Sequence, residues 1–235
     1  MQGQLFTTDF LLRGITELQI WHDADQHGYA PFRAELVRIF SSRTAQSELN
    51  EAQTEDEIVK PILNALGFAD AWLPQVNIGK KGREDVPDYL LFADSTRKAD
   101  ALTRSEPERA KLGLAVVEAK RWLRELDRRD ESGSGNLKPR DFGAPSSQML
   151  RYLSRVDVSS DRAVKWGMLT NGAVWRLYWQ DARSRSEEFL EINIAAALAV
   201  SGVQTELGAP DPEHTLRLFF ILFNRSAFLP QQWDS

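Results

Sequence analysis

Two short apolar runs in this 235-residue chain each carry a carboxylate side chain at one end. Residues 89–92 directly follow Asp88, and residues 114–117 lead directly into Glu118. Apolar runs of this length predict buried strands, and a charge that terminates a buried strand needs an ionic partner or a metal ion. Any fold of this chain must therefore bury both runs and supply partners for the acidic groups at their ends.

The N-terminal part of the sequence has helical periodicity. Apolar residues recur at three- and four-residue spacing through the first fifty residues, with a polar break at residues 22–28. The helix that follows has two candidate starts, because Asn50 with Gln53 and Thr54 with Glu57 can each form a capping box.

The remaining predicted elements are short. The predicted strands are bounded by turn residues and cover residues 73–78, 86–92, 114–120, 164–169, 174–179 and 189–194. Asn171-Gly172 joins the fourth and fifth strands and is a strong hairpin signal. Further helices are predicted at residues 146–155 and from residue 212 to about 228. Three polar stretches separate these elements. Residues 79–83 are interpreted as a basic turn, residues 93–112 as an excursion between two strands and residues 131–136 as a mobile loop.

This order of elements predicts an α/β fold in which helices flank a central mixed sheet. Residues 1–49 are expected to form an N-terminal helical extension that packs on the core. Residues 50–235 carry the sheet, and residues 211–235 within them carry the closing helix.

Composition and motifs exclude several classes of protein. The chain has no cysteine, so it has neither disulfides nor thiolate metal ligands. Its three histidines lack the spacing of a zinc site. It has no G-x-S-x-G motif of serine hydrolases and no G-x-x-x-x-G-K motif of nucleotide-binding proteins. The longest apolar runs are far shorter than the roughly 20 residues that span a bilayer, and no secretory signal is visible. A cytoplasmic location without a membrane partner is therefore expected.

The net charge of −5 argues against a broad surface that coats nucleic acid. The net charge of the whole chain is misleading, however, because the negative charge of carboxylates that bind a divalent metal is offset when the metal binds. Basic residues gather near the two strand ends, at Lys80, Lys81, Arg83, Lys120, Arg121, Arg124, Arg128, Arg129, Lys138 and Arg140. Acidic residues lie among those of the second group, so we expect this chain alone to bind DNA weakly.

The charged strand ends predict a metal site. Residues two apart on a strand point to the same face, so Glu118 and Lys120 project together while Ala119 faces the opposite layer. If the two strands are neighbours, Asp88 reaches the same face. Two carboxylates and the backbone carbonyl of Ala119 form an oxygen-rich site suited to Mg²⁺, and a lysine beside it suits an anionic substrate. Taken alone, the same residues are also typical of a solvated ion pair and of a turn.

Three motifs in this order resemble the PD-(D/E)xK nuclease superfamily. Pro87-Asp88 matches its first element and Glu118-Ala119-Lys120 its second. In the following helix, Gln148 and Tyr152 fit the Q-x-x-x-Y motif of a subset of these nucleases, and their i, i+4 spacing puts both on one helical face. Taken singly, Gln148 is equally typical of an exposed helix position and Tyr152 of a core aromatic. The resemblance implies a restriction-endonuclease-like core.

The resemblance covers about residues 50–195. Residues 50–67 and 169–178 are similar to the N-terminal endonuclease domain of type IIG restriction-modification enzymes, in which one polypeptide carries nuclease, methyltransferase and target recognition. The chain is also similar to the nuclease domain of type I restriction subunits. Residues 219–228 resemble the segment that precedes the methyltransferase part. The span between the first two motifs is longer than the compact family motif, which implies an insertion at about residues 93–112 and leaves open whether the two strands pair directly.

The resemblance implies a Mg²⁺-dependent endonuclease domain, with Mn²⁺ as a substitute metal. Such a domain hydrolyses phosphodiester bonds of double-stranded DNA and leaves 5′-phosphates. Asp88 and Glu118 are expected to hold the metal, and Lys120 is expected to position the attacking water. Gln148 and Tyr152 are expected to support the site and the nearby phosphate.

The family often adds one carboxylate from its first core helix. Glu51 and Glu55 are both candidates, because both lie along the buried stripe of that helix. Either residue is equally explained by a favourable interaction with the helix dipole, so the choice between them stays open.

The resemblance also implies partners beyond this chain. They are a methyltransferase and target-recognition region in the same full-length polypeptide, and a second copy on DNA if both strands are to be cut. Two alternatives remain. One is a catalytically inactive nuclease fold that serves as a DNA-binding or assembly module, and the other is the nuclease domain of a motor-linked subunit similar to type I enzymes.

Overall fold

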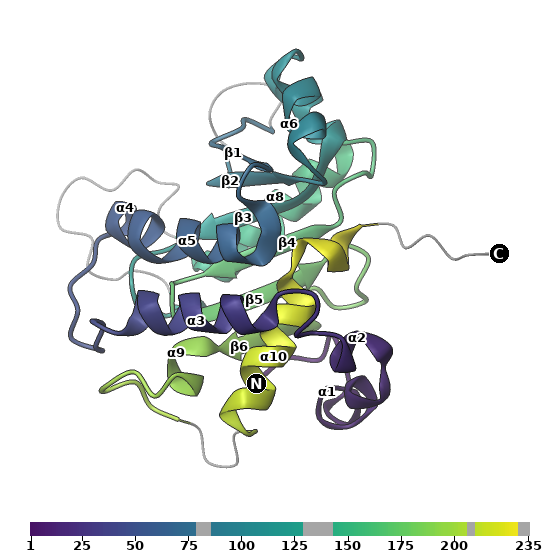
Figure 1. Cartoon of the computed structure of the whole chain (residues 1–235). Helices are drawn as coiled ribbons and strands as arrows, with labels where there is room; N and C mark the ends of the chain where they lie inside the picture. Colours follow the sequence, from purple (N-terminus) through teal and green to yellow (C-terminus); the bar gives the residue numbers. More distant parts are fainter. Residues whose placement is uncertain (79–85, 129–142, 206–209, 230–235) are drawn as a thin grey trace.

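The computed structural model describes four stretches of the chain (Figure 1), residues 1–78, 86–128, 143–205 and 210–229. The basic turn predicted at residues 79–83 and the loop predicted at residues 131–136 lie outside these stretches. Within them, no helix has both the length and the apolar character needed to cross a membrane.

The centre of the molecule is a mixed six-stranded sheet flanked by helices, so the predicted α/β fold is confirmed and is consistent with a restriction-endonuclease-like core. The strands lie side by side in chain order, as β1 (Trp72–Pro74), β2 (Tyr89–Phe92), β3 (Gly113–Ala119), β4 (Trp166–Thr170), β5 (Val174–Trp179) and β6 (Phe189–Asn193). All neighbours are antiparallel except β3 and β4, which are parallel. Parallel neighbours require a crossover, which contains helix α8 (Pro145–Ser159).

Helix α8 packs closely against one face of the sheet. A Cβ atom added to Gly167 of β4 would lie only 2.6 Å from the Sδ atom of Met149 and 3.1 Å from the Cδ2 atom of Leu153. A glycine at this position therefore allows the helix to approach the strand backbone.

The opposite face is covered in part by one helical segment. It contains α4 (Glu51–Thr54) and α5 (Lys60–Leu63), which alternate with π-helical turns at Glu55–Val59 and Asn64–Phe68. Of the two predicted capping boxes, the one formed by Asn50 and Gln53 is present.

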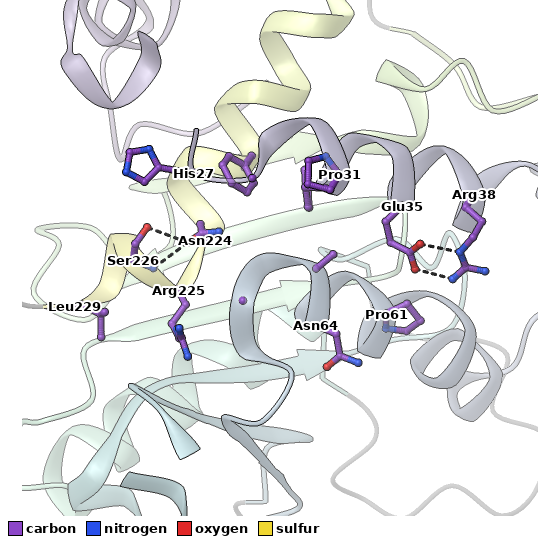
Figure 2. A pocket seen from close by; sticks show the side chains of 15 residues that line it. His27, Pro31, Glu35, Arg38, Pro61, Asn64, Asn224, Arg225, Ser226 and Leu229 are labelled. Atoms are coloured by element: carbon purple, nitrogen blue, oxygen red, sulfur yellow. Dashed lines mark hydrogen bonds and ion pairs between the residues drawn. The ribbon is translucent and has the colours of Figure 1, made fainter. Parts of the chain in front are cut away.

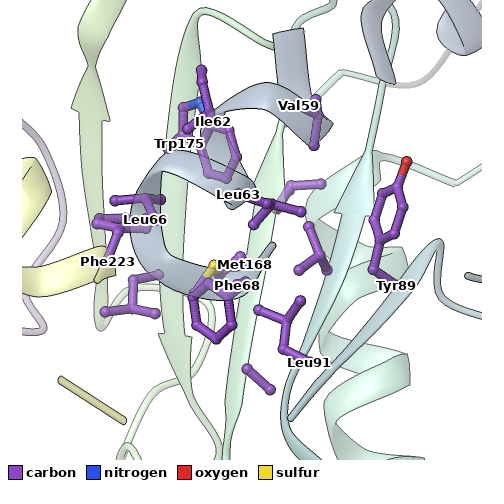
Figure 3. Packing of buried hydrophobic residues seen from close by; sticks show 14 of the residues in the cluster. Val59, Ile62, Leu63, Leu66, Phe68, Tyr89, Leu91, Met168, Trp175 and Phe223 are labelled. Carbon is purple, nitrogen blue, oxygen red and sulfur yellow. The ribbon is translucent and has the colours of Figure 1, made fainter. Parts of the chain in front are cut away.

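The buried face of this segment forms the centre of the hydrophobic core. Figure 3 shows its aliphatic side chains packed among residues of the sheet and of helix α10 (Pro212–Phe223). The labelled residues are Val59, Ile62, Leu63, Leu66, Phe68, Tyr89, Leu91, Met168, Trp175 and Phe223.

The N-terminal helices pack on this core as expected. They are α1 (Thr8–Leu12), a 3₁₀ turn (Gly14–Glu17), α2 (Gln19–His22) and α3 (Tyr29–Phe40). The ring centroid of Phe32 lies 5.1 Å from that of Phe220 in α10, and the Tyr29 hydroxyl donates to the Glu213 carboxylate at 2.7 Å. Residues 1–49 thus share one hydrophobic cluster with the sheet.

The insertion between β2 and β3 is helical. It contains α6 (Ser95–Leu102), α7 (Glu106–Arg109) and a 3₁₀ turn (Ala110–Leu112). The two strands nevertheless pair directly, with Tyr89 opposite Val117. The short helix α9 (Ile194–Ala197) follows β6.

Several predicted boundaries are wrong. The strand predicted at residues 73–78 ends at Pro74, because Gln75 has a positive φ of 49° and leaves the extended conformation. The strand predicted at residues 86–92 begins only at Tyr89, since Pro87 has no N–H group for the ladder.

The two longer helices also differ from the prediction. Helix α8 continues beyond Arg155 to Ser159. The closing helix α10 ends at Phe223, because Asn224 is extended with a ψ of 145°, and a 3₁₀ turn (Arg225–Phe228) follows.

Candidate active site

Asp88 and Glu118 lie at the same end of two paired strands. The last ladder pair of β2 and β3 is Tyr89 with Val117, so extending the register by one residue places Asp88 opposite Glu118. Opposite residues of a pair project to one face. Asp88 is fixed there because its Oδ2 atom accepts a hydrogen bond from the N–H of Ala119 at 2.7 Å.

Lys120 joins this pair of carboxylates. Its Nζ atom lies 2.5 Å from Oε1 of Glu118, and its backbone N–H donates to the carbonyl of Thr170 at 2.8 Å. Glu118 is 2% exposed and Lys120 is 9% exposed. The second oxygen of Glu118, Oε2, is buried and has no hydrogen-bond partner among the described residues. One carboxylate oxygen is thus neutralised by the lysine, while the other remains unsatisfied.

Burial and mutual repulsion shift the protonation equilibria of the site. Burial raises the pKa of Glu118 to about 6, although the charge of Lys120 acts in the opposite direction. The pKa of Asp88 is raised well above its usual value, first by burial and then by the negative charge of Glu118. Burial acts to lower the pKa of Lys120, but the surrounding carboxylates outweigh it and the pKa is raised. The site therefore holds a charged lysine beside two carboxylates that are costly to ionise together.

The two helix glutamates take different positions. Glu51 lies at the edge of the cluster, with its Oε1 atom 4.0 Å from Nζ of Lys120. Glu55 accepts a hydrogen bond from the hydroxyl of Tyr89, on the face opposite to Asp88. Of the two candidates, Glu51 is therefore the one that contacts a residue of the cluster.

Gln148 and Tyr152 lie one helical turn apart on α8. The amide Nε2 of Gln148 donates to the Tyr152 hydroxyl at 2.8 Å. Burial raises the pKa of Tyr152, and the charge of Glu118 raises it further, so this phenol lies within electrostatic reach of the carboxylates. The predicted helical pair is formed, and its phenol interacts electrostatically with the cluster.

The donor set fits a divalent metal ion. Asp88 and Glu118 supply oxygen ligands at one strand end, and an unsatisfied buried oxygen beside a second carboxylate is stabilised by a cation. In an extended strand the N–H and C=O groups of one residue point the same way, so the Ala119 carbonyl faces the strand that carries Asp88. The described residues contain no group of three or more His, Asp or Glu side chains placed to hold a metal. The fit therefore depends on two carboxylates and a carbonyl.

One acidic residue near the second motif, Asp127, is paired with an arginine and does not belong to the candidate site. Asp127 accepts two hydrogen bonds from the guanidinium of Arg176, each 2.7 Å long. Arg176 is buried on β5 and also donates to Glu191. These charges form a separate ionic cluster, which lowers the pKa of Asp127 through the hydrogen bonds from Arg176.

Two residues that support the site were not predicted as functional. The sequence predicts Asn171 only as part of a turn and Thr54 only as a possible helix cap. In the structure both hydrogen-bond the segment that follows Lys120, through Arg124 and Trp122. Their side chains are buried polar groups far from Lys120 in sequence, and no local pattern reveals such contacts.

A groove lies elsewhere on the molecule. It has a volume of about 810 Å³ and runs between α3, the end of the α4–α5 segment and the last 3₁₀ turn (Figure 2). His27, Pro31, Asn64 and Arg225 are among its lining residues, which do not include Asp88, Glu118 or Lys120. We locate the candidate site at the carboxylates because the titratable groups converge there.

Comparison of the chain with protein-family models, curated proteins and solved structures finds no match.

Proposed function

We propose that this chain is a Mg²⁺-dependent DNA endonuclease domain. The observation that carries the proposal is the convergence of Asp88, Glu118 and Lys120 at one end of two paired strands, where a buried carboxylate oxygen lacks a partner among the described residues. The hydrogen-bonded pair of Gln148 and Tyr152 on helix α8 supports the same proposal. These groups agree with the residue types and order of the nuclease resemblance.

The residues divide the work of phosphodiester hydrolysis. A bound divalent metal supplies Lewis-acid polarisation of the phosphodiester and a more acidic water. Asp88 and Glu118 hold it, and the hydrogen bond from Ala119 N–H keeps Asp88 oriented. Lys120 positions the attacking water, and because it stays protonated it also offsets the negative charge that develops on the phosphate. Gln148 and Tyr152, which are hydrogen-bonded to each other on α8, support the site and the nearby backbone phosphate.

The resemblance extends this proposal to a biological setting. The chain acts as the cleavage domain of a cytoplasmic restriction-modification enzyme, and target recognition and methylation belong to another region of that enzyme. A single site cuts one strand, so cleavage of both strands requires a second copy. The products carry 5′-phosphates, which a ligase can rejoin.

The experiment that tests the proposal is nicking of supercoiled plasmid DNA in Mg²⁺. Glu118→Gln and Lys120→Met are expected to abolish nicking. Lys111 forms exposed ion pairs with Glu108 and Asp161 at 3.0 and 2.9 Å, so Glu108→Gln and Lys111→Met are matched controls that should cut normally. If the two site variants cut as fast as the wild type, the assigned site is wrong. If the wild type binds DNA but never cuts it in Mg²⁺ or Mn²⁺, the inactive-module alternative replaces the proposal.

A further inference from the structure

The segment after Lys120 has a strained backbone. Leu123 adopts a φ of 55°, in the left-handed region that is strained for any residue other than glycine because its Cβ atom approaches the following carbonyl oxygen. Such a conformation persists only when the surrounding structure holds it, and such residues cluster at functional sites. Contacts around Leu123 should therefore reveal what holds this segment in place.

Asn171 holds the chain at Leu123 and at the residue that follows it. Its backbone carbonyl accepts a hydrogen bond from the N–H of Leu123 at 3.2 Å. Its side-chain Nδ2 donates to the carbonyl of Arg124 at 2.8 Å. The Oδ1 atom of the same amide accepts from the N–H groups of Ala173 and Val174 at 3.1 and 2.8 Å. One buried side chain thus ties the strained segment to the β4–β5 turn.

A second contact comes from helix α4. The Thr54 hydroxyl accepts a hydrogen bond from the N–H of Trp122 at 2.9 Å and itself donates to the carbonyl of Asn50 at 2.8 Å. The indole N–H of Trp122 donates to the carbonyl of Thr44 at 3.0 Å. The segment after Lys120 is therefore held from the sheet, from α4 and from the N-terminal extension.

We propose that Asn171 and Thr54 are positioning residues that hold Lys120 against Glu118. Lys120 is the first residue beyond β3, and its own N–H is bonded to Thr170, the neighbour of Asn171. Rotation of the following turn would swing the lysine away from the carboxylates. The inference rests on the proposed nuclease function, because it names residues that orient the proposed catalytic lysine without touching DNA.

The variant Asn171→Ser tests the sheet contact. A serine hydroxyl can still accept from the turn N–H groups, but it removes the amide donor to Arg124. The matched control is Asn193→Ser, because Asn193 caps α9 and serine caps a helix equally well. We expect Asn171→Ser to lower kcat for plasmid nicking about tenfold or more with KM unchanged, as misplacement of a catalytic group does. Asn193→Ser should match the wild type.

Two variants of Thr54 test the contact from α4. Thr54→Val keeps the shape but loses the acceptor for the Trp122 N–H, so kcat should fall with KM unchanged. Thr54→Ser restores the hydroxyl and should restore kcat. A loss of kcat in the serine variant as large as that in the valine variant contradicts the role of the hydrogen bond.

Amide hydrogen exchange separates failure of this inference from failure of the nuclease proposal. Asn171→Ser should accelerate exchange at Lys120 and Leu123 and leave Phe219 in α10 unchanged. An active wild type whose Asn171→Ser variant keeps full kcat overturns the positioning role. A wild type that never cuts DNA refutes the nuclease function. In that case, exchange at Lys120 and Leu123 that is unchanged in Asn171→Ser also overturns the proposal that Asn171 holds this segment in place.

Discussion

The Nζ atom of Lys120 lies 2.5 Å from Oε1 of Glu118, whereas Oε2 of the same carboxylate is buried without a hydrogen-bond partner in the described part of the chain. The lysine therefore neutralises one oxygen and leaves the other available to a ligand. Because both side chains are buried, removing either charge leaves the other uncompensated in a medium of low dielectric. Stability, pH response and metal binding should all depend on this pair.

Breaking the pair from the lysine side should be costly. Lys120→Met leaves the Glu118 carboxylate beside Asp88 and should lower the free energy of unfolding by about 3–5 kcal/mol. The double variant Glu118→Gln/Lys120→Met removes both charges and should recover most of this loss. Urea unfolding at neutral pH with a chelator measures both. Lys111→Met at the exposed control pair should cost under about 1 kcal/mol. A double variant as unstable as the single one contradicts the expected compensation.

The stability of the protein should depend on pH through Glu118. Burial raises the pKa of this carboxyl from 4.5 to about 6, so the folded protein binds more protons than the unfolded chain between these values. The contribution of Glu118 is fully present below pH 4.5 and is lost as the pH rises through 6, about 2 kcal/mol in all. The difference in unfolding free energy between wild type and Glu118→Gln, measured with a chelator, should fall by this amount. A difference that does not change with pH contradicts the shift.

Asp88→Asn should separate activity from stability. The asparagine side chain can still accept from the N–H of Ala119, but it no longer repels Glu118, so the free energy of unfolding should rise by about 1 kcal/mol, or roughly 2–4 °C in Tm. DNA nicking should be lost. Asp94→Asn is the matched control, because Asp94 caps α6 by accepting from the N–H of Arg97, and asparagine caps equally well. A clear loss of stability in Asp88→Asn would argue against like-charge repulsion at the site.

Divalent metal should stabilise the folded chain through the same carboxylates. At a Mg²⁺ concentration about 100-fold above the dissociation constant, binding adds about 2.7 kcal/mol to the free energy of unfolding. Thermal unfolding with and without Mg²⁺ or Mn²⁺ measures the effect. The increase should vanish in Asp88→Asn and persist in Asp94→Asn. Equal metal effects in both variants would place the metal elsewhere.

The sequence predicted those features that depend on neighbouring residues. The capping box of Asn50 and Gln53 and the Asn171-Gly172 hairpin are local signals. Strand β5, which follows the hairpin turn, is predicted by its own apolar pattern. The alternation of side chains along a strand likewise predicted that Glu118 and Lys120 project together, as their ion pair requires. These features need no information about the rest of the fold.

The sequence could not decide which distant groups meet. It left the choice between Glu51 and Glu55 open, and only the packing of α4 over the strand end brings Glu51 to within 4.0 Å of Lys120 and turns Glu55 toward Tyr89. It also left open whether β2 and β3 pair across their long insertion, which they do.

The contact between Asn171 and Arg124 joins residues 47 positions apart. Periodicity, capping and turn preferences act over a few residues and therefore determined the elements and the charged strand ends of this protein. The choice among alternative partners for a buried polar group is made by burial itself, because a hydrogen bond left unmade in the interior is costly. Only the tertiary structure could therefore decide what surrounds Lys120.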